Sequence, residues 1–470
     1  MDMCVNALNS NISVSKNSLS ARKNNMSNPI EQTNLPQANS QISFRGGNDV
    51  TFRTKLSTKE EHEAFNTVAT ELSGENKKLL NGLLKSGILL KNNSDDKSTV
   101  LDNLHKIATT PRAEGLENKV ILQNVVQTLA FPYSINQKLG DIPEEYKAKA
   151  LQSLLDNKDL ELNTLQEADN KFNDLHSSTC PTACVEFNLA SKHPAEFARF
   201  ANELTSPKLS VDKIVDLRNL SKNTGEATWL LNAFNTEHEI IGQDKAKITL
   251  KPDKDALLRA QIQTKYQDGL ERNATDVLIQ STFMNTGSQK TYNSIIDERK
   301  GNFSQNTSGL IEFEKTFIES VVENKSTTSM LYQQVDEDMV VTGYEADFKT
   351  IKKQILDTLK RDQNVIIGIT YFEKDKENPD TTRSMDAIAG GHEITIVGAK
   401  TAKNGETVFV CQDSDDEVNA PVELPESWLL PRLHHAGLPE DIAERTIRDK
   451  RENWQISLEN YKKMKEDVAE

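Results

Sequence analysis

Residues 390–398 read Gly-Gly-His-Glu-Ile-Thr-Ile-Val-Gly, and residues 408–413 read Val-Phe-Val-Cys-Gln-Asp. Both runs are short and mostly apolar, which is typical of buried strands. The loop between them contains Asn-Gly, a turn signal, so the two runs are predicted to pair as a hairpin. The hairpin would hold the imidazole of His392 where one strand begins and the carboxylate of Asp413 where the other ends. An imidazole and a carboxylate are two of the three groups of a catalytic triad.

A thiol for such a triad is offered by residues 178–184, which read Ser-Thr-Cys-Pro-Thr-Ala-Cys and precede apolar residues with helical spacing. Proline is favoured in the first turn of a helix because its missing N–H would have no partner there. Cys180 is therefore predicted at or near the N-cap, where free N–H groups and the helix dipole stabilise a thiolate. Cys184 lies one turn further along, where a small apolar residue normally packs, and it is the alternative nucleophile.

The carboxylate of the triad has competitors, because Asp415 and Asp416 follow Asp413 closely. Side chains alternate along a strand, and this alternation groups Asp413 with two apolar side chains of the second run. The alternation favours Asp413 as the partner of His392. The order thiol, imidazole, carboxylate does not identify an enzyme by itself, because triads recur in many chain orders.

Length, charge and hydropathy exclude several classes of function. The chain has 470 residues and a net charge of -15, whereas a nucleic-acid-binding face is basic. The sequence contains no run of about 18 apolar residues, so no membrane span is expected. Its first residues lack the apolar core of about 7–15 residues that marks a conventional secretory signal. We therefore expect neither nucleic acid nor a membrane as a partner.

Four cysteines are too few for a disulfide scaffold and suit a reducing compartment. A zinc site at Cys180 and Cys184 would need further ligands, and the histidines show no paired spacing near these cysteines. His434 and His435 are interpreted as surface residues. The sequence thus predicts neither a metal site nor another cofactor.

The chain divides into four predicted regions. Residues 1–50 are rich in Ser and Asn without periodicity and are expected to be disordered. Residues 51–170 carry apolar residues at helical spacing, which predicts a domain of four to six helices. Residues 171–430 are predicted to form the domain that carries the triad, with a helical insertion at about 206–340. Residues 431–470 are charged and are predicted to form a helical tail.

Three segments together resemble the papain-like cysteine peptidase clan, in particular its bacterial branch of bacteriocin-processing, or double-glycine, peptidases. Residues 179–185 resemble the nucleophile segment of that branch, a Cys followed by small residues and an apolar helix. Residues 359–369 resemble its helix, tight turn and buried strand. Residues 391–398 and 409–414 resemble its His strand and its Asp or Asn strand. The resemblance implies an α+β papain-like fold, with the Cys at a helix N-terminus facing an antiparallel sheet that carries His and Asp.

The resemblance also implies a role for each residue. Cys180 would be the nucleophile, His392 the general base and acid, and Asp413 the group that orients the imidazole. In the family a Gln about six residues before the nucleophile usually serves as an oxyanion-hole donor. Here that place falls near Asn173, which is the tentative replacement, with Gln166 as another.

One further departure concerns the residue after the nucleophile, where Pro181 replaces the Gly that the family usually has. Loss of an oxyanion-hole donor typically costs about 10²–10³ in rate. The sequence therefore leaves open whether the constellation is fully active.

The function predicted from these residues is a thiol hydrolase that cleaves a peptide or isopeptide bond in a polypeptide substrate. One alternative is a glutamine deamidase or a transglutaminase-like acyl-transfer effector, because the same constellation serves both reactions. Another is a catalytically inactive papain-like binding protein. The protein is expected in the cytoplasm, or exported by a specialised secretion system that needs no conventional signal. The oligomeric state stays open.

Overall fold

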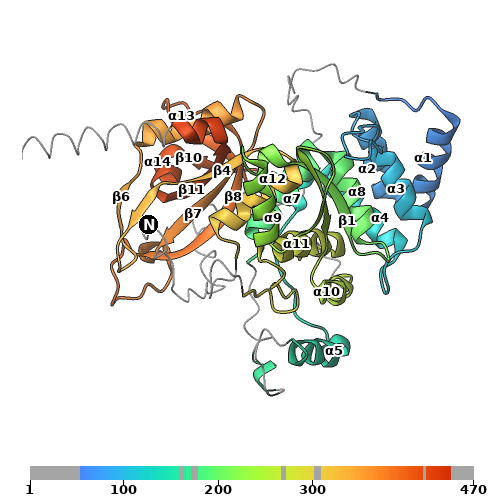
Figure 1. Cartoon of the computed structure of the whole chain (residues 1–470), viewed down its shortest axis with the longest axis horizontal. Helices are drawn as coiled ribbons and strands as arrows, with labels where there is room; N and C mark the ends of the chain where they lie inside the picture. The colour runs from blue at the N-terminus through green and yellow to red at the C-terminus, as the bar shows by residue number, and fades with distance from the viewer. Residues whose placement is uncertain are drawn as a thin grey trace, which may run out of the picture.

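The structure is a computed structural model that describes residues 53–157, 164, 166–168, 170, 178–265, 271–300, 309–416 and 420–445. In this part of the chain, helices combine with antiparallel sheets, which confirms the predicted α+β class (Figure 1). The predicted disorder of residues 1–50 concerns a segment that lies outside the described residues.

Five α-helices follow one another in the region predicted to be helical. They are α1 (Lys59–Glu71), α2 (Gly74–Lys85), α3 (Val100–Thr109), α4 (Asn118–Ala130) and α5 (Glu144–Leu155). Thr58 and Thr99 begin α1 and α3 with capping boxes, in which side chain and backbone satisfy one another's hydrogen bonds. The 3-10 turn η2 (Pro132–Ser134) follows α4. The helical prediction is confirmed for these segments.

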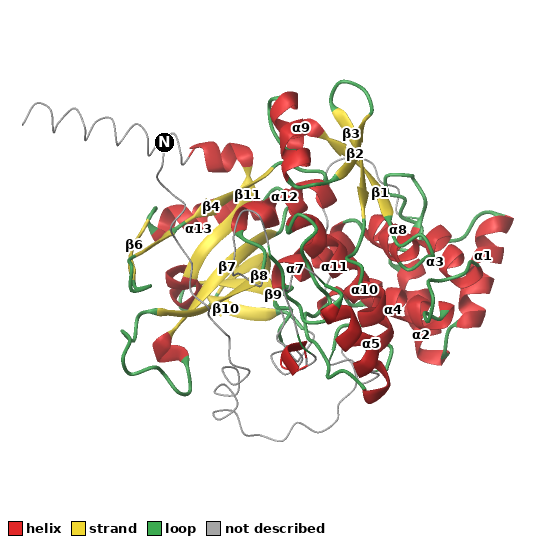
Figure 2. Cartoon of the chain, turned by 60° about the horizontal axis from the view of Figure 1, so that its bottom comes forward, coloured by secondary structure: helices red, strands yellow, loops and turns green. Residues whose placement is uncertain are grey.

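The helices α7 (Cys180–Lys192) and α11 (Ala274–Gly287) lie near the centre of the molecule, and α8 (Pro194–Leu204) lies between them and the N-terminal helices (Figure 2). Every residue of α11 is buried, so this helix has neighbours on all sides. One hydrophobic core joins these three helices with α1–α4. The N-terminal helices therefore pack directly against the layer that contains the helix beginning at Cys180.

A six-stranded antiparallel sheet has the strand order β10-β9-β8-β7-β11-β4. Its strands are β4 (Thr327–Leu331), β7 (Val365–Phe372), β8 (Ile388–Thr401), β9 (Thr407–Gln412), β10 (Val422–Pro425) and β11 (Leu433–Pro439). The strands β8 and β9 pair as the predicted hairpin. His392 lies inside β8 and not at its start, because pairing with β7 extends the strand back to Ile388.

Helices cover both faces of this sheet (Figure 1). On one face, α7 and α12 (Glu312–Glu323) share a core with Ile366 of β7. On the other face, α13 (Phe348–Leu359) and α14 (Glu426–Leu429) pack around Ile367 and its neighbours. Successive side chains of a strand point to opposite faces, which explains why adjacent residues of β7 belong to different cores.

Most of the remaining elements come between α8 and β7 in the sequence. A three-stranded antiparallel sheet has the order β1-β3-β2, and β5 pairs with β6. These strands are β1 (Val211–Asp216), β2 (Glu237–Ile240), β3 (Lys245–Leu250), β5 (Gln333–Val335) and β6 (Val341–Tyr344). The helices are η4 (Leu217–Asn219), α9 (Thr224–Ala233), α10 (Ala256–Gln263), η5 (Glu373–Asp375) and η6 (Leu430–Arg432). The region predicted as a helical insertion at about 206–340 thus also contains several strands.

The prediction of a helical tail from residue 431 onward is wrong for Leu433–Pro439, which form β11 between β7 and β4. The predicted tail is highly charged as a whole, so its short apolar segment was not recognised as a strand. In the sheet this segment has a neighbouring strand on each side. Residues 440–445 are helical, and the rest of the predicted tail lies outside the described residues.

A buried ion cluster ties α8 to β1. Glu196 accepts hydrogen bonds from Arg199 at 2.7 and 2.8 Å and from Lys213 at 2.8 Å, and Asp95 contacts Lys213 at 3.0 Å. Burial alone would raise the pKa of Glu196, but Arg199 and Lys213 outweigh it and lower the pKa to about 2. Glu196 is therefore ionised at neutral pH.

We expect Glu196→Ala to lower the free energy of unfolding by about 3–5 kcal/mol, because it leaves two buried cations without their shared carboxylate. Glu203→Ala is the matched control. Glu203 also contacts Arg199, at 3.1 Å, but is 27% exposed, so its loss should cost about 0–1 kcal/mol. Urea denaturation of the two variants measures the difference, and equal losses would contradict the assignment.

Candidate active site

Cys180 is the first residue of α7, and Thr179 is the N-cap. Pro181 takes the second helical position, where its missing N–H costs no hydrogen bond. The thiol therefore lies at the helix N-terminus, within one residue of the predicted place. Cys180 is partly exposed, whereas Cys184 and Cys411 are buried.

His392 and Asp413 are in direct contact across β8 and the end of β9. His392 Nε2 lies 2.7 Å from Asp413 Oδ1, and the same oxygen accepts a hydrogen bond from the backbone N–H of Asp415 at 2.9 Å. The side chains of His392 and Asp413 are 9% and 22% exposed. Because Asp413 engages Nε2, Nδ1 is the ring nitrogen left for a second partner.

The side chain of Cys180 is close enough to the His392 ring to affect its protonation. Burial disfavours the imidazolium, but the Asp413 carboxylate and then Cys180 outweigh burial and raise the pKa of His392 well above its usual range. The surroundings of the ring therefore favour its protonated form. An imidazolium beside a cysteine sulfur favours the thiolate, which is the nucleophilic form.

Cys184, the alternative nucleophile, has a different environment. Its side chain is fully buried, close to that of Thr395 on β8. Burial raises the pKa of the Cys184 thiol far above its usual range. A buried thiol that resists ionisation is a poor nucleophile, so the geometry favours Cys180.

Buried polar side chains hold the backbone that leads into Cys180. Ser178 Oγ donates to Asp297 Oδ2 at 2.9 Å, and the backbone N–H of Ser178 donates to the same oxygen. Arg272 Nη1 donates to Thr179 Oγ1 at 3.2 Å. These four side chains are buried, so the contacts fix the start of the helix that carries the thiol.

A second segment, residues 135–137, holds both neighbours of Asp413. Gln412 Nε2 donates to the carbonyl of Ile135 at 3.2 Å, and Ser414 Oγ donates to Gln137 Oε1 at 2.9 Å. The backbone N–H of Gln137 also donates to the carbonyl of Ser414 at 3.0 Å. Sequence reasoning missed Gln137, because 277 positions separate it from Ser414 and no local motif marks it.

The predicted oxyanion-hole donor, Asn173, lies outside the described residues, so its role stays a prediction. Gln166, the other candidate, is exposed and donates its side-chain N–H to Asn170 at 3.1 Å. Sequence proximity to Cys180 is thus the sole argument for either residue.

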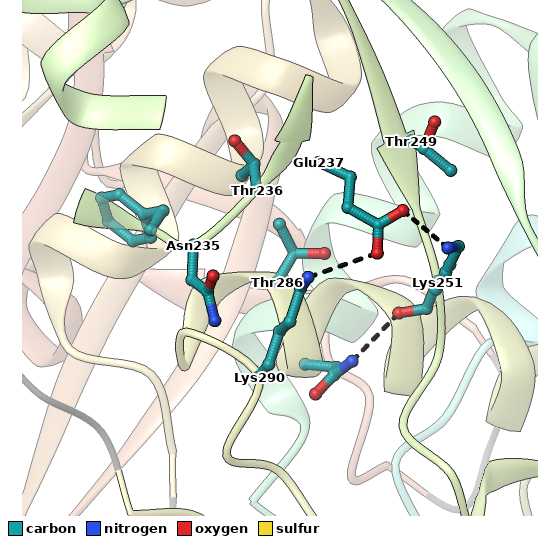
Figure 3. A pocket seen from close by; sticks show the side chains of 9 residues that line it. Asn235, Thr236, Glu237, Thr249, Lys251, Thr286 and Lys290 are labelled. Atoms are coloured by element: carbon teal, nitrogen blue, oxygen red, sulfur yellow. Dashed lines mark hydrogen bonds and ion pairs between the residues drawn. The ribbon is translucent and has the colours of Figure 1, made fainter. Parts of the chain in front are cut away.

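A separate surface pocket lies between β2, β3 and the end of α11 (Figure 3). Glu237 accepts hydrogen bonds there from Lys251 at 2.6 Å and from Lys290 at 3.4 Å. None of the residues that line this pocket belongs to the group of Cys180, His392 and Asp413. Glu237 already pairs with both lysines of the pocket, so we assign the pocket no function.

The interpretation of His434 and His435 as surface residues is wrong. The side chains of His434 and His435 are 12% and 6% exposed, because β11 is an inner strand of the sheet. Their surroundings are separate from the contact of His392 with Asp413 and are described below.

Comparison of the chain with protein-family models, with curated proteins and with solved structures finds no match. In the described part of the chain, no helix is both long and apolar enough to cross a bilayer.

We expect a chloroacetamide probe at neutral pH to alkylate Cys180, and Cys180→Ala to abolish this labelling. Cys184→Ala should leave it unchanged, because the thiol of Cys184 is buried and un-ionised. Fragment-ion mass spectrometry can assign the adduct to one of the two cysteines. An adduct on Cys184 in the unmodified protein would move the nucleophile one turn along α7.

The raised pKa of His392 also predicts a pH dependence of stability. A histidine whose pKa is raised by folding stabilises the folded state fully below its unfolded pKa of about 6.5. That contribution declines as the pH rises through the folded pKa. The melting temperature of the parent minus that of His392→Gln should therefore be larger at pH 6 than at pH 9. In an Asp413→Asn background, which removes the main cause of the raised pKa, the same difference should be nearly flat.

Proposed function

We propose that this protein is a thiol hydrolase that cleaves a peptide or isopeptide bond, with Cys180, His392 and Asp413 disposed as in papain-like peptidases. The observation that carries the proposal is the 2.7 Å contact of His392 with Asp413, made by a ring on which a helix-N-terminal thiol also acts. The supporting observation is that both sides of this contact are held by buried polar residues, since catalytic groups need a fixed geometry.

In the proposed reaction, the Cys180 thiolate attacks the carbonyl carbon of the substrate and forms a tetrahedral intermediate. The imidazolium of His392 gives its proton to the leaving amine, the C–N bond breaks, and an acyl-thioester remains. His392 then removes a proton from water, which attacks the thioester carbonyl and releases Cys180. Asp413 orients the ring and stabilises its charge throughout.

Two other outcomes share these groups. Attack on a side-chain amide would convert glutamine to glutamate, or transfer the acyl group to an amine, without breaking the chain. A binding protein would keep the contact of His392 with Asp413 and turn over no substrate. Product analysis by mass spectrometry separates the three outcomes, since only hydrolysis of the chain yields two shorter peptides.

We expect His392→Ala to lower the hydrolysis rate of a peptide library by about 10²–10⁴, because the leaving amine loses its acid and the thiol its base. Asp413→Asn should cost much less, because an asparagine oxygen still accepts the hydrogen bond from the ring N–H. Melting curves of both variants control for folding. An unchanged rate in His392→Ala would rule out the proposed triad.

A further inference from the structure

A second group of chemically active side chains lies where β11 meets the first turn of α12. Glu312 is the first residue of α12, and His434 and His435 are the second and third residues of β11. His434 Nδ1 lies 2.9 Å from His435 Nδ1. Glu312 Oε1 lies 3.4 Å from His434 Nδ1 and 3.7 Å from His435 Nδ1. Two imidazole nitrogens and one carboxylate oxygen therefore converge on one point.

A β-bulge brings the two neighbouring histidines together. Leu433 pairs with Ile369 and His435 pairs with Gly368, so that His434 is an extra residue in β11. Neighbours in a regular strand point to opposite faces, but a bulge re-aims one side chain. The bulge thus gives both rings access to Glu312.

We propose that Glu312, His434 and His435 form a binding site for a divalent transition-metal ion of the zinc type. The point equidistant from the three ligand atoms lies about 2.0 Å from each of them, as calculated from their three separations. Zinc bonds to imidazole nitrogen and carboxylate oxygen are about 2.0–2.2 Å long. The site does not depend on the proposed function of Cys180.

The surroundings of His435 support metal binding. A metal-bound imidazole usually donates its other N–H to a carboxylate, which fixes the tautomer. His435 Nε2 lies 2.8 Å from Glu393 Oε1, and Lys315 Nζ donates to Glu393 Oε2 at 3.1 Å. With neutral imidazoles, Glu312 and Glu393 give two negative charges against the one positive charge of Lys315. The net negative charge favours a cation.

Gly368 makes the room that the ring of His435 needs. A Cβ atom at residue 368 would lie 2.2 Å from Cε1 and 2.6 Å from Nδ1 of His435. Solvent reaches the site beside Glu312, whose side chain is 30% exposed, and water would complete the coordination there.

One metal-free arrangement competes with this site. Lys315 Nζ lies 2.5 Å from His435 Nε2, so the ammonium can donate to that nitrogen while His435 Nδ1–H donates to His434 Nδ1. Metal binding requires the other tautomer, in which Nε2–H faces Glu393. Uptake of the metal therefore requires the His435 proton to move from Nδ1 to Nε2, a change of tautomer that leaves the ring neutral.

The test is calorimetric titration of Zn²⁺ into the chelator-treated full chain carrying Cys180→Ala, which removes a competing thiolate site at Cys180 and His392. We expect one saturable site per chain and a rise in melting temperature with zinc. Glu312→Gln should weaken binding at least 100-fold and abolish this rise. Glu393→Gln should weaken binding about 10–100-fold, as outer partners of metal ligands do. His62→Ala, on α1, should change nothing.

Titration with Co²⁺ reports the ligand type, because thiolate ligands add intense near-ultraviolet charge-transfer bands that nitrogen and oxygen ligands lack. We expect visible Co²⁺ bands without charge transfer. Absence of a saturable site, or equal affinity in Glu312→Gln, would overturn the proposal and assign the cluster to the metal-free hydrogen-bond chain. Glu312 is partly exposed at a helix start, so Glu312→Gln should fold even where a variant of His434 does not.

Discussion

The register of β8 against β9 is the constraint on which the candidate active site depends. Thr395 pairs with Gln412, which places the next residue of that chain segment, Asp413, opposite Ile394. His392 lies two residues before Ile394 in β8, on the same face of the sheet. Diagonal neighbours of this kind are within reach of each other's side chains. A slip of one residue would turn the imidazole and the carboxylate to opposite faces. The apolar alternation that buries the hairpin therefore also fixes the polar contact.

The second requirement is that α7, a buried helix, keeps its N-terminus against this hairpin. A buried polar network provides the connection. Gln280 of α11 donates to Glu186 of α7 at 2.9 Å and to the carbonyl of Asn136 at 3.0 Å. Burial, and then the charge of Asp276, raises the pKa of Glu186 well above its usual range, and burial raises that of Asp276 to about 7. Two carboxyls that resist ionisation can remain in a core, and the network links the helix of the thiol to the segment that holds the neighbours of Asp413.

Local pattern was sufficient to predict the helices of the N-terminal half, the strand β7, the hairpin and the position of Cys180 at a helix start. Local pattern failed at β11, because this short apolar strand lies inside a charged segment and shows no periodicity in the sequence. Its identity as a strand depends on pairing with β7 and β4, which are distant in the sequence. Local pattern also failed for Gln137 and Glu312, whose contacts with Ser414 and with the β11 histidines bring together distant parts of the chain. The carboxylate next to the His392 imidazole was predictable because both lie on one hairpin.

Two adjacent residues of β8 serve two separate groups of side chains. His392 contacts Asp413, whereas Glu393, its neighbour, contacts Lys315 and His435. The two side chains therefore belong to different groups of contacts. They still share one backbone, and that backbone is paired on both sides, with β7 and β9. A change at Glu393 that leaves the backbone in place should therefore alter the β11 group alone, whereas a change that shifts the register of β8 would disrupt both groups together.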